Sequence, residues 1–93
     1  MSITDRLAEE MKDAMRSQDK LRLSTIRMLL SAVKYKEIDL GKKLTDEEVI
    51  ETITSSVKQR RDSIEQFSKA GRTDLVEKEE AELKILQGFL PEQ

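Results

Sequence analysis

The sequence contains no cysteine, no histidine and no tryptophan, and only three glycines and one proline among 93 residues. The common zinc sites and the cysteine and histidine nucleophiles need a thiolate or an imidazole, so these kinds of chemistry are excluded. Disulfides cannot stabilise the fold either. The residue types that remain for chemistry are Asp, Glu, Lys, Ser and Tyr.

Long apolar runs are also missing. The sequence has no stretch of about 18 apolar residues, so we expect no transmembrane helix and no membrane partner. The first ten residues, MSITDRLAEE, carry acids where a secretory signal peptide needs a basic region and then an apolar one. We therefore expect a soluble, unprocessed protein of the cytoplasm.

Charge is abundant but nearly balanced, with 17 Lys and Arg residues against 19 Asp and Glu residues. Charged residues make up 39% of the chain and aromatic residues 3%, proportions that also occur in disordered segments. A fold is nevertheless indicated, because 37% of the residues are apolar and they recur with a clear period. At this length we expect a single domain over residues 1–93.

Apolar residues recur at spacings of three and four in four segments, and no segment alternates with a period of two. This pattern predicts an all-α, four-helix bundle-like domain. The expected helices span about residues 2–17, 19–40, 45–70 and 73–87. Gly41, Gly71 and Gly88 follow the last three segments, and we expect each to end its helix in the left-handed conformation that glycine tolerates.

The start of the third segment carries the clearest local signal. Thr45 and Glu48 have the T-x-x-E spacing of a capping box, and Leu44 precedes the cap where its side chain can contact Val49. Caps are also expected from Ser2 and Asp19.

One apolar face of each helix is expected to point into a common core. The residues assigned to it are Ile3, Leu7, Ala8, Met11, Ala14, Met15, Leu23, Ile26, Leu29, Leu30, Val33, Ile50, Ile53, Val57, Ile64, Phe67, Leu75, Val76, Leu83 and Leu86. Met28 is also interpreted as core filler. The segment 89–91, Phe-Leu-Pro, is expected to fold back on the bundle.

Positive charge is concentrated in residues 20–43, whose net charge is +5. Within them, five residues at helical spacings form one face without an acid. This set, the basic stripe, comprises Lys20, Ser24, Arg27, Ser31 and Lys34. Its small serines would let a phosphate backbone approach the cations closely. A solvated face opposite the core has the same pattern, so both interpretations stay open.

A second basic cluster, at Lys58, Arg60 and Arg61, is expected on the third helix and is partly offset by Asp62 and Glu65. The candidate RNA-binding residues are Lys20, Arg27, Lys34, Lys58 and Arg61. Tyr35 is the only aromatic residue on the basic segment, so we expect contact with the RNA backbone and not base readout.

No catalytic or metal-binding constellation is recognised. The acids Glu77, Glu79, Glu80 and Glu82 occur with Lys78 and Lys84, and i, i+4 pairs such as Glu80 and Lys84 are typical of a solvated helix surface. The sequence has no Gly-rich phosphate loop, and its serines have no histidine partner. We therefore assign no catalytic residue, no metal and no cofactor.

Four stretches carry a family resemblance. They are LAEEMKDAMRSQDKLRLSTIRMLLSAVKYKEI, LTDEEVI, VKQRRDSIEQFSKAGRTDLVEKEEAEL and ILQGFLPEQ. With them the chain resembles, from end to end, the YqeY-like family, relatives of the tail of the B subunit of the glutamine-dependent aspartyl/glutamyl-tRNA amidotransferase. The most specific stretch covers residues 58–83, where a basic cluster, a glycine break and an acidic helix follow in order.

The resemblance implies a two-domain helical protein whose N-terminal bundle ends at a Leu-Pro-x-Gln hinge, here residues 90–93. We therefore expect the chain to be the N-terminal domain, with a smaller helical domain absent. The resemblance also implies that the related tail of the amidotransferase contacts tRNA, while other domains of that enzyme release ammonia and activate the carboxylate. The family carries the label of a carbon–nitrogen ligase with glutamine as amido donor, so whether this chain is an enzyme stays open.

The leading hypothesis is a non-catalytic, tRNA- or RNA-associated helical module that could be accessory to glutamine-dependent tRNA amidation. The alternative is a protein-interaction module with no nucleic-acid role, because blocks of opposite charge also suit a charged partner surface. A DNA partner is not expected.

Overall fold

The structure, a computed structural model, describes residues 2–91. Its helices are α1 (Ile3–Arg16), α2 (Lys20–Leu40), α3 (Asp46–Lys69) and α4 (Thr73–Gln87). Residues 2–91 contain no strand, so the prediction of an all-α domain is confirmed. No helix in this part of the chain is long and apolar enough to cross a membrane. Glu92 and Gln93 of the expected hinge lie outside the described residues.

The predicted caps form. At α3, the Thr45 hydroxyl accepts a hydrogen bond from the Glu48 amide at 3.2 Å, and the Glu48 carboxylate accepts one from the Thr45 amide at 3.0 Å. Ser2 forms a capping box of the same kind at α1, and the Asp19 carboxylate accepts from the Arg22 amide at 3.1 Å at α2. These side chains satisfy amides that have no partner within the first helical turn.

The glycines end their helices in two different ways. Gly41 and Gly71 adopt φ values of +69° and +70°, the left-handed conformation that was predicted. The prediction is wrong for Gly88, whose φ is −63°. Beyond it the Phe89 amide donates to the Leu86 carbonyl, and the Leu90 amide to the Gln87 carbonyl, both at 3.1 Å. The backbone thus continues to wind in right-handed turns and needs no left-handed residue.

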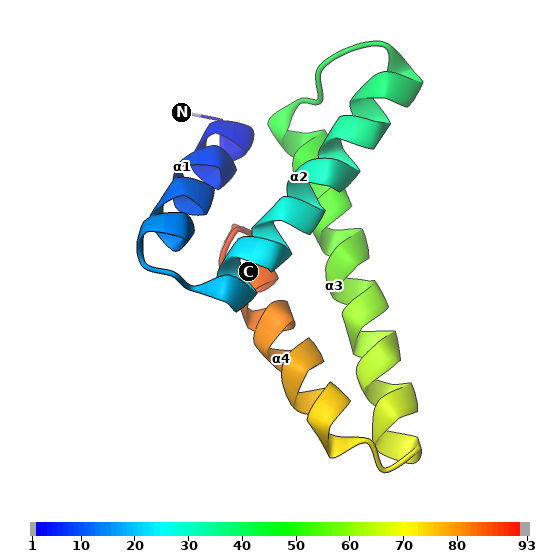
Figure 1. Cartoon of the computed structure of the whole chain (residues 1–93). Coiled ribbons are helices and arrows are strands. Elements are labelled where there is room, and N and C mark those ends of the chain that lie inside the picture. Colours follow the sequence, from blue (N-terminus) through cyan, green and yellow to red (C-terminus); the bar gives the residue numbers. More distant parts are fainter. Residues whose placement is uncertain (1, 92–93) are drawn as a thin grey trace.

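Figure 1 shows how the helices are arranged. Helices α3 and α4 run antiparallel as a hairpin, α2 crosses the N-terminal half of α3, and α1 lies beside α2. The far end of the hairpin, around Gly71, projects away from α1 and α2. At about 1.5 Å per residue, the 24 residues of α3 span about 36 Å, close to the longest dimension of the molecule, 42 Å.

All four helices contribute to one core. Its buried apolar residues are Leu7, Ile26, Leu29, Val33, Val49, Ile53, Val57, Leu86 and Phe89. Leu44 packs against this cluster, as expected of a residue that contacts Val49. Residues 89–91 fold back on the bundle as predicted, with Phe89 only 3% exposed.

The assignment of Met15 and Met28 to the core is wrong, because each side chain is 50% exposed. The predicted ridge on α1 stepped from Leu7 to Met15 in increments of four residues. Since a helix turn takes 3.6 residues, every such step rotates the position by about 40°, and two steps carry Met15 off the packed face. Ala14, which is 2% exposed, takes the inward position.

Candidate nucleic-acid interface

Helix α2 presents the basic stripe to solvent. Lys20, Arg27 and Lys34 are exposed, whereas Ile26 and Leu29, on the opposite side of the helix, are buried. The three cations recur every seven residues, so they extend over about 21 Å of helix at about 1.5 Å per residue. The structure therefore brings these predicted residues together on one outward face.

The cations of this face are not used by the fold. None of the ion pairs formed among residues 2–91 includes Lys20, Arg27 or Lys34. Arg22, on the same helix, has a different environment. It pairs with Glu10 of α1, and its guanidinium carbon lies 5.8 Å from the centre of the Phe89 ring. Arg22 thus holds the C-terminal segment in place and is not part of the outward face.

Arg6 of α1 holds the same segment. Its guanidinium carbon lies 5.0 Å from the centre of the Phe89 ring, and its Nη2 donates to the Gly88 carbonyl at 3.0 Å. Its Nε donates to Glu10 at 3.0 Å, so Glu10 links Arg6 and Arg22. Cations over an aromatic face are attracted by the ring, so this cluster fixes where residues 88–91 lie.

A shallow hollow of about 240 Å³ continues the outward face of α2 toward its C-terminus. Ser31, Lys34, Tyr35 and Ile38 line it, and all four belong to α2. Tyr35 is 72% exposed and Ile38 is 67% exposed. Tyr35 was expected on the basic segment, but the hollow was not predicted, because Ile38 was not recognised as a solvent-facing residue.

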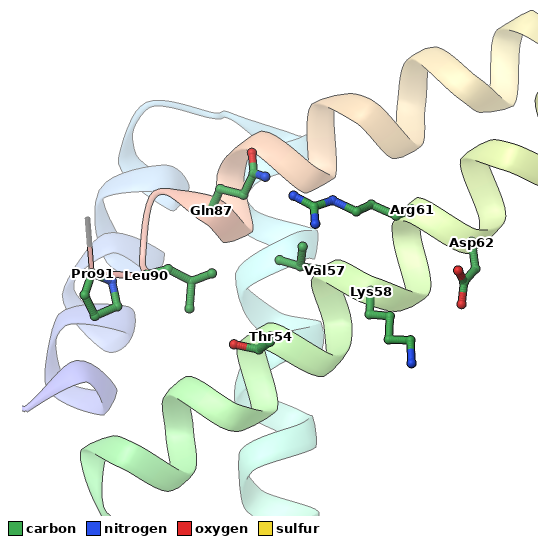
Figure 2. Close-up of a pocket in the computed structure, with 8 residues that line it drawn as sticks. All are labelled: Thr54, Val57, Lys58, Arg61, Asp62, Gln87, Leu90 and Pro91. Atoms are coloured by element: carbon green, nitrogen blue, oxygen red, sulfur yellow. The ribbon is translucent and has the colours of Figure 1, made fainter. Parts of the chain in front are cut away.

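Lys58 and Arg61 lie in a different place, beside a groove of about 610 Å³ between α3 and the C-terminal segment. This groove, the tail groove, is lined by Thr54, Val57, Lys58, Arg61, Asp62, Gln87, Leu90 and Pro91. Figure 2 shows Arg61 directed toward Gln87 across the gap between α3 and α4, and Lys58 directed away from α4. Leu90 forms one wall of the tail groove. The position of Leu90 depends on the contacts that Arg6 and Arg22 make with the C-terminal segment, residues 88–91.

The two groups of predicted residues do not share a surface. Helix α3 meets α2 through a side that includes Ser56 and Arg60, which line a hollow together with Met28 of α2. Lys58 and Arg61 point to another side of α3, and α2 lies behind α3 in the view that shows them (Figure 2). A single short RNA segment on the basic stripe would therefore not reach them.

Arg60 and Glu82 form a buried ion pair that was not predicted from the sequence. The Arg60 Nε and Nη2 atoms lie 3.2 and 3.1 Å from Oε2 of Glu82, with side chains only 13% and 9% exposed. The assignment of Glu82 to a solvated surface is therefore wrong. The spacing of these residues could have indicated their burial. Arg60 follows Val57 by three residues and Glu82 precedes Leu86 by four, so both lie on the apolar faces of their helices.

Displaced pKa values occur at two helix starts. Hydrogen bonds from the Thr45 amide and hydroxyl lower the pKa of Glu48 below its usual 4.5. At the tip of the α3–α4 hairpin, a hydrogen bond from Arg72 lowers the pKa of Asp74 and raises that of Arg72. Capping and the hairpin turn account for these shifts. Within residues 2–91, no group of three or more acids is placed to hold a metal ion.

Comparison with known proteins gives a family and several relatives. Residues 4–93 match the family described as Yqey-like protein. A Lachancea thermotolerans protein named "Altered inheritance of mitochondria protein 41, mitochondrial" is 47% identical over 85 residues, which are 90% of this chain and 46% of that protein. Its namesake in Kluyveromyces lactis is 46% identical over 89% of this chain and 45% of its own length.

An uncharacterized protein of Schizosaccharomyces pombe is 37% identical over 92% of this chain and 70% of its own length. The chain thus spans about half the length of the two mitochondrial relatives. Their names contradict the expected cytoplasmic location, since both are named as mitochondrial proteins. The expectation failed because the composition of the first residues argues only against a secretory leader and does not test other destinations.

Proposed function

Because the chain belongs to the Yqey-like protein family, whose resemblance to the amidotransferase tail implies contact with tRNA, we propose that it is a non-catalytic RNA-binding module. The outward face of α2 carries this proposal. Its three cations, Lys20, Arg27 and Lys34, are exposed and take part in no ion pair within residues 2–91.

The face is suited to a phosphate backbone. Serines separate the cations, so no bulky side chain or acid keeps a backbone at a distance. Each phosphate contact releases counterions and contributes about 0.7 to 0.9 to the dependence of log K on log salt. Three contacts support weak binding that is lost as salt is added, and the net charge of −2 adds no long-range attraction.

The cellular role that we propose is accessory to glutamine-dependent amidation of tRNA, in mitochondria. The tRNA part rests on the family resemblance, and the location rests on the names of the two relatives. In this role the chain would orient tRNA, while ammonia release and carboxylate activation would be carried out by other polypeptides.

A protein partner is the second candidate, and the tail groove favours it. The groove has an apolar floor at Val57 and Leu90. Two cations, Lys58 and Arg61, line it against one acid, Asp62, so its net positive charge suits an acidic, partly apolar segment. This candidate uses a different surface from the basic stripe, so the two can be tested separately.

The test compares three double charge reversals in the full chain. Arg27→Glu with Lys34→Glu should weaken tRNA binding and reduce the salt slope by about 1.4 to 1.8. Lys12→Glu with Lys78→Glu, on α1 and α4, changes the net charge equally and should leave binding much closer to that of the unmodified chain. Lys58→Glu with Arg61→Glu tests the tail groove.

Gel shift and salt titration measure these effects, and circular dichroism checks that helicity is unchanged. Equal losses in the first two variants would show that only net charge matters and would remove the basic stripe from the mechanism. A loss confined to the third variant would move RNA binding to the tail groove. Unchanged tRNA binding in all three would favour the protein-partner candidate.

A further inference from the structure

We propose that Tyr35 forms a stacking platform for one unpaired base, at the end of the phosphate-binding face of α2. The inference rests on the proposed function and sharpens it: the RNA bound by this chain would have a single-stranded nucleotide beside the backbone segment held by Arg27 and Lys34. The stacked base would be held by its face, so its identity would matter little.

The first observation is the position of the ring. Tyr35 is 72% exposed on a helix whose opposite side packs into the core, and Ile38, beside it, is 67% exposed. A large apolar side chain gains nothing from folding when it stays in water, and two of them that line one hollow form a small apolar surface next to solvent. The fold therefore leaves this surface free to pack against something else.

The second observation is the positive charge of Lys34 beside the ring. Lys34 lines the same hollow, and Ser31 lies at its edge, four residues after Arg27. Tyr35 is eight positions after Arg27, which is about 12 Å along the helix axis. One nucleotide seated on the ring can therefore have its phosphates near these two cations.

Charge complementarity selects a nucleotide as the occupant. An acidic, partly apolar peptide also suits an apolar surface beside a cation. Lys34, however, belongs both to this hollow and to the basic stripe, so a nucleic acid held along the stripe brings a phosphate and a flat apolar base to the ring together. The base must be unpaired, because the faces of bases inside a duplex are already covered by their neighbours.

The composition of the chain provides a direct measurement. Tyr35 is the only tyrosine and the chain has no tryptophan, so its emission is the intrinsic fluorescence of the protein. A single-stranded oligoribonucleotide should quench this emission with the same midpoint as binding measured by fluorescence anisotropy of a labelled strand. A blunt-ended RNA duplex should bind with little quenching.

Variants separate stacking from charge. Tyr35→Ala should lower the affinity for the single strand at least about fivefold and leave the affinity for the duplex unchanged. Tyr35→Phe keeps the aromatic ring and should retain the affinity for the single strand. Met15→Ala, which truncates an exposed apolar side chain on α1, is the control and should change neither affinity. An oligonucleotide that lacks one base should bind the unmodified chain more weakly than its complete counterpart.

The outcomes distinguish this inference from the proposed function. If Tyr35→Ala binds both RNAs like the unmodified chain, while charge reversal at Arg27 and Lys34 weakens binding, the stacking platform is wrong and the RNA-binding module stands. If Tyr35→Ala weakens both RNAs equally, the ring contacts the sugar-phosphate backbone and stacking is again wrong. If the unmodified chain binds neither RNA, both proposals fail.

Discussion

The basic stripe of α2 and the basic cluster of α3 each contain three cations, but the surroundings of these cations differ. On α2, the three cations point to solvent and form no ion pair among the described residues. On α3, Arg60 turns inward to a buried carboxylate, while Lys58 and Arg61 flank the tail groove.

The difference lies in the register of each cluster relative to the apolar face of its helix. Residues of the basic stripe recur at four and seven positions and stay together on one side. Arg60 and Arg61 are neighbours in the sequence, and adjacent residues on a helix point about 100° apart. Cations that are adjacent in a sequence can therefore differ in role, because one can stabilise the fold through a buried ion pair while the next faces solvent and is available to a ligand.

Breaking the buried ion pair between Arg60 and Glu82 should give the largest loss of stability. Glu82→Ala leaves the Arg60 guanidinium buried without a partner, so it should lower the free energy of unfolding by about 3 to 5 kcal/mol. The double variant Arg60→Met with Glu82→Leu should recover most of this loss, because apolar residues of similar volume replace both charges. Urea denaturation measures both, and equal losses in the single and double variants would refute an uncompensated charge as the cause.

Arg22 provides a comparison within α2 itself. Arg22→Ala removes the ion pair to Glu10 and the contact with the Phe89 ring. It should lower the free energy of unfolding by about 1.5 kcal/mol. The same substitution at Arg27, five residues further along, should cost almost nothing. Thermal unfolding of the two variants tests whether the two cations differ as described, and equal melting temperatures would show that they do not.

The cap of α3 should give the next effect. Thr45→Ala removes the hydroxyl that accepts from the Glu48 amide, and should lower the free energy of unfolding by about 1 kcal/mol. Thr45→Ser keeps the acceptor and should restore most of the loss. An unchanged urea midpoint in the alanine variant would contradict the role of this capping box.

Low pH should remove part of the stabilisation that the capping box gives to α3. The pKa of Glu48 is lower in the folded chain than its usual 4.5, so its stabilising effect is complete above that pH and is lost as the pH falls through the folded pKa. Glu48→Gln should therefore flatten the decrease in unfolding free energy between about pH 6 and pH 3. Glu47→Gln, in the same helical turn, is the control, and identical pH profiles for the two variants would overturn the assignment.

The outward face of α2 should contribute least to stability. Arg27→Ala and Lys34→Ala should each change the unfolding free energy by no more than about 0.5 kcal/mol, because neither residue has a partner that the fold depends on. A loss above about 1 kcal/mol would show that the fold uses these cations, and would weaken their interpretation as an RNA-binding surface.

Local chemistry allowed the helices to be predicted closely. The Thr45–Glu48 box, the Asp19 cap and the glycine after α2 act through residues a few positions apart, so their spacing in the sequence is also their spacing in space. The grouping of Lys20, Arg27 and Lys34 on one face follows from helical geometry for the same reason.

By itself, then, the sequence determined the helices of residues 2–91, the N-terminal caps of α1, α2 and α3 and the common face of the basic stripe, because all of these depend on contacts within a helix. Only the tertiary structure decided which faces meet. It paired Arg60 with Glu82 across 22 positions, placed Arg6 against Gly88 across 82, and separated Lys58 and Arg61 from the basic stripe. These outcomes depend on how the helices cross, and the spacing of residues along one helix carries no information about the helix that packs against it.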